Sequence, residues 1–161
     1  MSQENCFVIH PACVQLDVAS TDWADAIQAA CRPLITGGFV KPDYPADVIA
    51  REKKWATGLP TLPAGVAIPH ALGADNVIEA QIAACRLQRA VSFVQSGGTE
   101  QDDPVEVQLI FILALKDSKA QLHLLQRLML AISDEEMLAG LLQADTPEKF
   151  SRIFNHSAKQ E

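Results

Sequence analysis

The segment 105–115, VEVQLIFILAL, constrains the fold of this chain more than any other stretch of its sequence. It begins with apolar and polar residues in alternation and then becomes apolar at every position. A strand with this pattern avoids water only inside a sheet that is covered on both faces. We therefore expect a central strand here, with helices packed against both sides of its sheet.

Further strands and helices are expected around this central strand. The strands are the run from Gly65 to Ile68, which Pro69 ends, and the segment 77–87. The helices are expected at 23–36 (closed by Gly37 and Gly38), at 46–55, at 119–132, at 134–143, and from Thr146-Pro147 onward.

Local signals place the ends of these helices. The side-chain oxygens at 20–22 can cap the first helix, and Pro45 suits the first turn of the second. Pro33 lacks the backbone donor that a helix interior needs, so it should kink or shorten the last turns of the first helix. Ser133 and Glu136 have the spacing of a capping box.

The order of these elements predicts the fold class. Helices that come before, between and after the strands indicate an α/β protein, built as a mixed β-sheet with helices on both faces. The chain of 161 residues has no fixed-period repeat, low-complexity tract or linker. We expect a single compact domain over residues 1–161, with its core at about 5–155.

Composition excludes several classes of function. Thirteen Lys and Arg against twenty Asp and Glu give a net charge of −7, which disfavours nucleic-acid binding and insertion into anionic membranes. The four cysteines form no CxxC pair, which argues against a disulfide scaffold and a structural zinc site. The N-terminus lacks the pattern of a signal peptide, and the longest apolar run, Leu109–Leu115, is far too short to span a membrane. We expect a cytoplasmic protein.

Common catalytic and nucleotide-binding motifs are absent from the sequence. There is no GxxxxGK[ST], GxGxxG, HExxH or GxSxG, so no standard phosphate loop, dinucleotide site, zinc protease helix or nucleophile elbow is predicted. Gly97-Gly98 is interpreted as a plain turn, and Asp102-Asp103 as a solvated loop. Trp23 and Trp55 are interpreted as packing residues.

Of the four histidines, His70 is the most informative. It follows a short strand and Pro69, so its imidazole is delivered at a strand end, where functional groups gather. A histidine with no nearby acid is largely neutral at cytoplasmic pH and carries one nitrogen lone pair that can attack. A histidine that is merely hydrogen-bonded at a strand end fits the same spacing, and both interpretations stay open. His10 and His156 are expected to be exposed and without a role.

Two basic positions are weaker candidates. His123 shares a helical stripe with Lys119 and Arg127, four residues away on either side. This electropositive stripe could face a phosphoryl group, although a solvated basic edge is the simpler interpretation. Arg51 lies in the charged cluster of the second helix and allows the same two interpretations.

The segment 50–71, AREKKWATGLPTLPAGVAIPHA, resembles the signature of the fructose/mannitol/galactitol-type EIIA domains (EIIA type 2) of the bacterial sugar phosphotransferase system. Those domains carry an Arg-Glu helix end, a Thr-Gly segment, a glycine, and a strand that ends in Ala-Ile-Pro-His. The long loop GLPTLPA between Thr57 and Gly65, with Trp55 before it, is most similar to the galactitol-specific branch.

This resemblance implies a phosphoryl relay. It implies that His70 is the phosphorylated nucleophile, that Arg51 and Thr57 bind phosphate, and that His123 is auxiliary. The domain would take a phosphoryl group from phospho-HPr and pass it to a cysteine of EIIB, which acts with the membrane component EIIC in the uptake of a hexitol such as galactitol. No cofactor and no metal are implied. The alternative is a regulatory module of the nitrogen type, whose phosphorylation at His70 controls protein partners.

Overall fold

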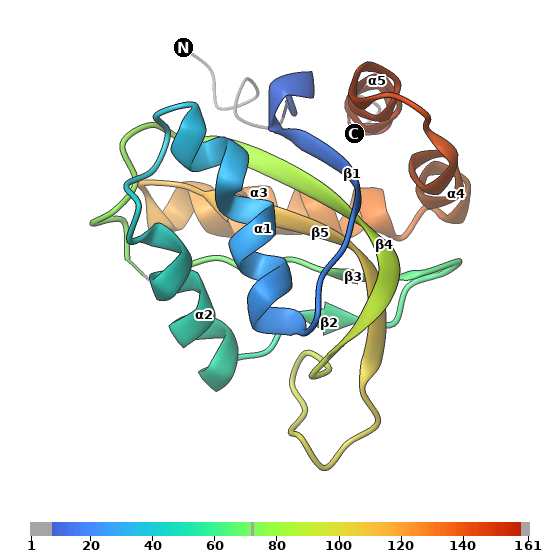
Figure 1. Cartoon of the computed structure of the whole chain (residues 1–161), viewed down its shortest axis with the longest axis horizontal. Helices are drawn as coiled ribbons and strands as arrows, with labels where there is room; N and C mark the ends of the chain where they lie inside the picture. The colour runs from blue at the N-terminus through green and yellow to red at the C-terminus, as the bar shows by residue number, and fades with distance from the viewer. Residues whose placement is uncertain (1–7, 72, 159–161) are drawn as a thin grey trace.

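The computed structural model describes residues 8–71 and 73–158 and contains a five-stranded sheet in the order β1-β4-β5-β3-β2 (Figure 1). β5 lies at its centre, which confirms the prediction from segment 105–115. β1 runs parallel to β4 and β3 runs parallel to β5, whereas the pairs β4–β5 and β2–β3 are antiparallel. The strands are β1 (Val14–Val18), β2 (Gly58–Leu59), β3 (Gly65–Ala67), β4 (Gln81–Phe93) and β5 (Val105–Ala114).

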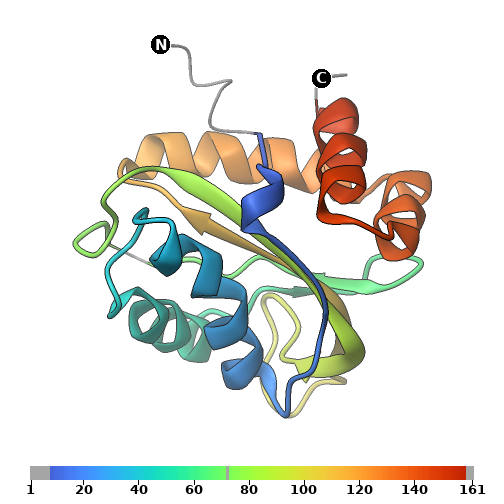
Figure 2. The same cartoon turned by 45° about the horizontal axis from the view of Figure 1, so that its top comes forward.

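Helices cover both faces of the sheet, as the α/β class predicted. α1 and α2 lie on one face and α3, α4 and α5 on the other, as the two views show (Figures 1 and 2). Among the described residues, no helix has the length and apolar character needed to cross a membrane. The helices are α1 (Trp23–Thr36), α2 (Tyr44–Lys54), α3 (Ser118–Ile132), α4 (Glu135–Gln143) and α5 (Pro147–Ala158), and a short 3₁₀ turn, η2 (Pro11–Cys13), precedes β1.

The two central strands send alternate side chains into two separate cores. In β4, Ile82 and Ala84 join the core beneath α3–α5, while Ala83 and Cys85 join the core beneath α1 and α2. In β5, Phe111 faces α5, where its ring centroid lies 5.3 Å from that of Phe154. Each large side chain buried in this way contributes roughly 1.5–3 kcal/mol, so both faces of the sheet need their helices.

The strand expected at 77–87 is shifted along the chain. β4 runs from Gln81 to Phe93, and the residues before it pair with the loop that follows α1 instead. Ile78 and Glu79 donate their backbone N–H groups to the Phe39 carbonyl, at 2.8 and 3.0 Å. Because the N–H groups of Ile78 and Glu79 are bonded to Phe39, they do not pair with a strand of the sheet.

Pro33 lies inside α1, which nevertheless continues to Thr36. A proline at this position leaves the Ala29 carbonyl, four residues earlier, without its helical donor. The side-chain amide of Gln15 in β1 fills the gap, because its Nε2 donates to the Ala29 carbonyl at 2.6 Å. The expected shortening is therefore wrong: a side chain from the neighbouring strand replaces the missing donor.

The starts of α2 and α4 differ from those expected from the sequence. α2 begins at Tyr44, two residues earlier than expected, with Pro45 in its first turn as predicted. The capping box of Ser133 and Glu136 is not formed. Asp134 caps α4 instead, since its carboxylate accepts from the backbone N–H of Glu136 and of Met137.

Arg86 of β4 ties the sheet to the end of α4. Its side chain is buried, and its Nη1 donates to the carbonyls of Leu141, Leu142 and Ala144 at 3.0, 3.1 and 2.6 Å. These carbonyls belong to the last turn and cap of a helix, where no backbone donor follows. Its Nη2 also pairs at 3.2 Å with the carboxylate of Asp17, an exposed residue that adopts a positive φ of 57° in β1.

Candidate functional site

A cleft of about 500 Å³ at the end of β3 brings His70, Arg51 and Thr57 together. The end of α2, the loop around β2, a turn after β4 and one face of α3 form its wall. His70 follows the end of β3 after Ile68 and Pro69, close to where the sequence predicted it, but it is only 6% exposed. The lining residues are Arg51, Lys54, Trp55, Ala56, Thr57, Leu59, Ile68, His70, Ser96, Gly97, Gly98, Leu125 and Met129.

The ring of His70 is held in one orientation by its own strand end. Its Nδ1 lies 2.9 Å from the carbonyl oxygen of Ile68. A carbonyl can only accept, so Nδ1 carries the proton in this bond and Nε2 carries the lone pair. Pro69 between the two residues has a fixed φ, which helps to place the carbonyl opposite the ring. The site therefore presents a nucleophilic Nε2.

The surroundings of His70 favour the neutral ring. Burial lowers the pKa of His70 below the ordinary value of 6.5. The hydrogen bond to Ile68 acts in the opposite direction, and the positive charge of Arg51 lowers the pKa further. A neutral imidazole keeps its lone pair, so these groups preserve the nucleophile.

We expect the ring of His70 to titrate below about pH 6.5 in the folded protein. Because its pKa is lower folded than unfolded, the unfolded chain takes up the proton first as the pH falls. The free energy of unfolding should thus be highest above about pH 6.5 and decline as the pH drops through the folded pKa. NMR titration of the ring C–H signals, with His70→Gln used to assign them, measures the midpoint. A midpoint above 6.5 would contradict the prediction.

Arg51 is fixed against Trp55 at the end of α2. Its Nη1 donates to the Trp55 carbonyl at 3.1 Å, and its Cζ lies 5.0 Å from the centroid of the indole ring. Its Nε is buried and has no hydrogen-bond partner among the described residues. A guanidinium held in this way keeps donors available for the oxygens of an anion in the cleft.

Thr57 is bound differently from what a phosphate ligand requires. Its backbone N–H and its hydroxyl both donate to the carboxylate of Glu52, at 2.8 and 2.9 Å. Its Oγ1 also accepts the backbone N–H of Ile68 at 3.2 Å. The structure therefore places Thr57 beside His70, with both of its donors already used by Glu52.

Replacing Thr57 with valine should destabilise the protein. The substitution keeps the shape of the side chain but leaves the buried N–H of Ile68 without an acceptor and removes one donor from Glu52. We expect a loss of about 1–3 kcal/mol in the free energy of unfolding, measured by urea denaturation. Thr57→Ser, which retains the hydroxyl, is the matched control and should lose much less. Equal losses in the two variants would show that the hydroxyl is unimportant.

The turn at Ser96–Gly98, which the sequence predicted as a plain turn, lines the same cleft, and this position was not predicted. It is brought there by backbone bonds to Gly58, whose N–H donates to the Val94 carbonyl at 3.1 Å and whose carbonyl accepts from Ser96 at 2.7 Å. The backbone segments around Gly58 and Val94 approach so closely that a Cβ on Gly58 would lie 2.6 Å from the Val94 oxygen. The glycine pair at 97–98 predicted a turn, but no sequence signal linked that turn to His70.

His123 lies on α3 with its side chain exposed. The residues of α3 that line the His70 cleft are Leu125 and Met129, which the sequence analysis did not single out. His123 is two residues before Leu125, about 200° away around the helix axis. Its auxiliary role therefore stays a prediction that this geometry does not support.

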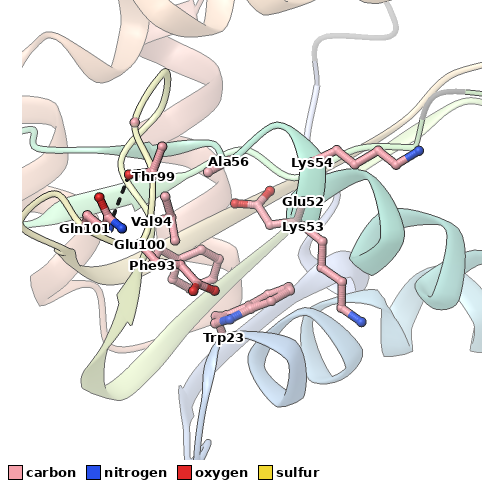
Figure 3. A pocket seen from close by; sticks show the side chains of 11 residues that line it. Trp23, Glu52, Lys53, Lys54, Ala56, Phe93, Val94, Thr99, Glu100 and Gln101 are labelled. Atoms are coloured by element: carbon pink, nitrogen blue, oxygen red, sulfur yellow. Dashed lines mark hydrogen bonds between the residues drawn. The ribbon is translucent and has the colours of Figure 1, made fainter.

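A second cleft, of about 680 Å³, lies beside the first and has Glu52 in its wall (Figure 3). Trp23 and Phe93 form its aromatic side, with ring centroids 6.4 Å apart. In Figure 3 the Glu52 side chain points into the space between α2 and the loop that carries Thr99. Glu52 thus stands between this cleft and Thr57 of the His70 cleft.

Comparison with known sequences matches nearly the whole chain to one family. The family model described as "Phosphoenolpyruvate-dependent sugar phosphotransferase system, EIIA 2" covers residues 7–157. SgcA of Escherichia coli (strain K12), named as a phosphotransferase IIA component, is 29% identical over 84% of this chain and 90% of its own length. The galactitol-specific EIIA component of the same strain is 25% identical over 80% of this chain and 83% of its own length. The mannitol-specific enzyme IIA component of Bacillus subtilis (strain 168) is 27% identical over 88% and 92%.

Solved structures share the fold. The IIAMtl–phosphorylated IIBMtl complex of Escherichia coli matches with a TM-score of 0.74, at 21% identity, over 92% of this chain and 97% of the other. The nitrogen regulatory protein IIA-Ntr of Neisseria meningitidis matches with a TM-score of 0.73, at 25% identity, over 93% and 98%. The sheet and helices described above are thus those of IIA domains.

Proposed function

The chain belongs to the EIIA 2 family of the phosphoenolpyruvate-dependent sugar phosphotransferase system, and from this premise we propose that it is a phosphocarrier that uses His70. Phospho-HPr is the proposed donor, and a cysteine of an EIIB that acts with a membrane EIIC is the proposed acceptor. The observation that carries the proposal is the bond from Nδ1 of His70 to the Ile68 carbonyl, which leaves Nε2 with the lone pair.

The proposed reaction has two balanced steps. First, the Nε2 lone pair of His70 attacks phosphorus, and the N–P bond of phospho-HPr breaks with its electron pair returning to the donor ring. His70 keeps the proton on Nδ1, and its ring gains positive charge that the Ile68 carbonyl faces. Second, a cysteine thiolate of EIIB attacks the same phosphorus, and the electron pair returns to Nε2. Both steps need positioning and charge stabilisation more than covalent help from the protein.

Arg51 is the proposed ligand of the phosphoryl oxygens. It lines the cleft with His70, and Trp55 holds its guanidinium in place. Arg51→Lys should slow phosphoryl transfer by about 10- to 100-fold, because lysine keeps the charge but loses the fork of donors. Rapid-quench measurement of transfer from phospho-HPr gives the rate, and Lys53→Gln, an exposed neighbour on α2, is the control. An unchanged rate in Arg51→Lys would remove Arg51 from the site.

The test of the proposal is the intact mass of the protein after incubation with phosphoenolpyruvate, Enzyme I and HPr. One acid-labile phosphoryl group should appear and should disappear when EIIB is added. A chain that gains no phosphoryl group, while a known EIIA does so in the same mixture, would refute the proposal.

The proposed substrate class is a hexitol, and galactitol is the first candidate. The long loop from Gly58 to Ala64 and the galactitol-specific and mannitol-specific relatives support this class. Offering phosphorylated protein separately to galactitol-type and mannitol-type EIIB distinguishes the two. The likeness to IIA-Ntr favours one alternative, a regulatory module controlled by phosphorylation of His70. Such a module would accept the phosphoryl group but pass it to neither EIIB.

A further inference from the structure

Glu52 is a buried carboxylate to which the sequence analysis gave no role. Only 5% of the residue is exposed, although it lies on α2 next to the exposed Lys53 and Lys54. Burial raises the pKa of Glu52, while the hydrogen bonds from Thr57 and the charge of Arg51 act in the opposite direction. A carboxylate taken out of water is costly unless its oxygens are bonded, so its bonds indicate what it is there to hold.

Those bonds form a continuous path from Glu52 to His70. The Glu52 carboxylate accepts both donors of Thr57, at 2.8 and 2.9 Å. The Thr57 hydroxyl oxygen accepts the N–H of Ile68 at 3.2 Å, and the Ile68 carbonyl accepts Nδ1–H of His70 at 2.9 Å. Each link therefore fixes the next, because Ile68 donates its N–H to Thr57 and accepts the Nδ1–H of His70 at its carbonyl.

The Glu52 carboxylate determines which partner donates and which accepts in the bonds of the Thr57 hydroxyl. An ionised carboxylate only accepts, so the Thr57 hydroxyl must give it the proton and is left with lone pairs for Ile68. The acceptor that the structure gives to the N–H of Ile68 is the side-chain oxygen of Thr57. The position of the strand end just before His70 is thus determined by a side chain on another element.

We propose that Glu52 is a positioning residue for phosphoryl transfer, which acts through Thr57 and Ile68 to fix the His70 ring with Nε2 as its nucleophile. The part of this inference that concerns phosphoryl transfer rests on the proposed function. The orientation of the His70 ring is argued from the hydrogen bonds alone. The hydrogen bonds of the Glu52 carboxylate go to Thr57 and not to the ring of His70. Glu52 is a positioning residue, whereas His70 is the catalytic one.

Glu52→Gln is the substitution that tests this. Glutamine has the same size, and its Oε1 can accept the Thr57 N–H, but its amide donates where the second carboxylate oxygen accepted. The Thr57 hydroxyl then loses its proton acceptor, and the link to Ile68 is disturbed. Glu79→Gln, an exposed glutamate outside the site, is the matched control.

Two readouts are expected to change in Glu52→Gln. The kcat of transfer from phospho-HPr should fall about 10- to 100-fold, with KM for HPr unchanged, because a displaced nucleophile loses rate and not partner binding. The ¹⁵N signals of the His70 ring should show a larger share of the tautomer protonated on Nε2. A variant that loses only thermal stability, with wild-type kcat and a wild-type tautomer ratio, would overturn the proposal.

The ring readout separates this inference from the proposed function. If the wild-type protein gains no phosphoryl group, the phosphocarrier proposal fails, and the tautomer ratio in Glu52→Gln still decides whether Glu52 orients His70. If circular dichroism shows that Glu52→Gln does not fold, Thr57→Val carries the test, since it breaks the path at its second member. The same tautomer shift is expected there, and a wild-type ratio would refute the path.

Discussion

Replacing His70 with glutamine is expected to abolish phosphoryl acceptance: no acid-labile mass should be gained from phospho-HPr, however long the incubation. Glutamine offers no ring nitrogen with a lone pair, so the N–P bond cannot form. Its amide can still donate to the Ile68 carbonyl, which His70 now satisfies through Nδ1. The loss of stability should therefore stay below the 2–5 kcal/mol typical of truncating a large core side chain.

His10→Gln is the matched control, because His10 is exposed and lies far along the chain from the cleft. It should gain the phosphoryl group at the wild-type rate. A His70→Gln protein that still gained one phosphoryl group, located by mass spectrometry at another residue, would move the acceptor away from the end of β3. A His70→Gln protein that unfolded at room temperature would instead make His70 a structural residue.

Replacing Arg86 with methionine should cause the largest loss of stability. Methionine retains an apolar stem of similar length but supplies no donors, so three buried or half-buried carbonyls at the end of α4 lose the bonds of Nη1. Nη1 shares two N–H groups among these three carbonyls, and at roughly 1.5 kcal/mol for each charged donor the free energy of unfolding should fall by about 3 kcal/mol. For a chain of this size, that corresponds to a decrease in Tm of roughly 6–12 °C.

Arg89→Met, on the same strand but exposed, is the control and should change Tm little. Scanning calorimetry of the two variants measures the difference. The partner Asp17 is exposed, so it can return to water when Arg86 is removed, and the ion pair itself should contribute little. If Asp17→Asn destabilised the protein as much as Arg86→Met, the ion pair and not the helix cap would be the important contact.

The central strand and most helices could be predicted from sequence because their signals are local. Segment 105–115 shows its burial directly, and each predicted helix has its own apolar stripe. β1 and the second half of β4 could not be predicted in this way. Residues 88–90 of β4 are exposed, so no apolar pattern marks them, and the strand continues there only because β5 pairs with Val91 and Phe93.

In the candidate site, too, local sequence predicts some features and tertiary contacts determine the others. The place of His70 at a strand end could be predicted because the strand, Pro69 and the histidine are adjacent in sequence, whereas its proposed role came from the resemblance to EIIA domains. The bonds from Thr57 to Glu52 depend on how the end of α2 meets β3, which no spacing reveals. The turn at Ser96–Gly98 reaches the cleft only through pairing with Gly58, almost forty residues earlier. Local sequence therefore identified the proposed nucleophile, whereas tertiary contacts determine what holds it.

The two edge strands have a consequence for how the molecule behaves at high concentration. An exposed strand recruits strands from other copies when it offers a straight run of unpaired backbone groups. β1 is interrupted at Asp17, where the backbone turns left-handed and the register with β4 shifts, and β2 has two residues before Pro60. Neither edge can template the long, regular pairing on which fibres grow, so the sheet is protected against aggregation at both ends.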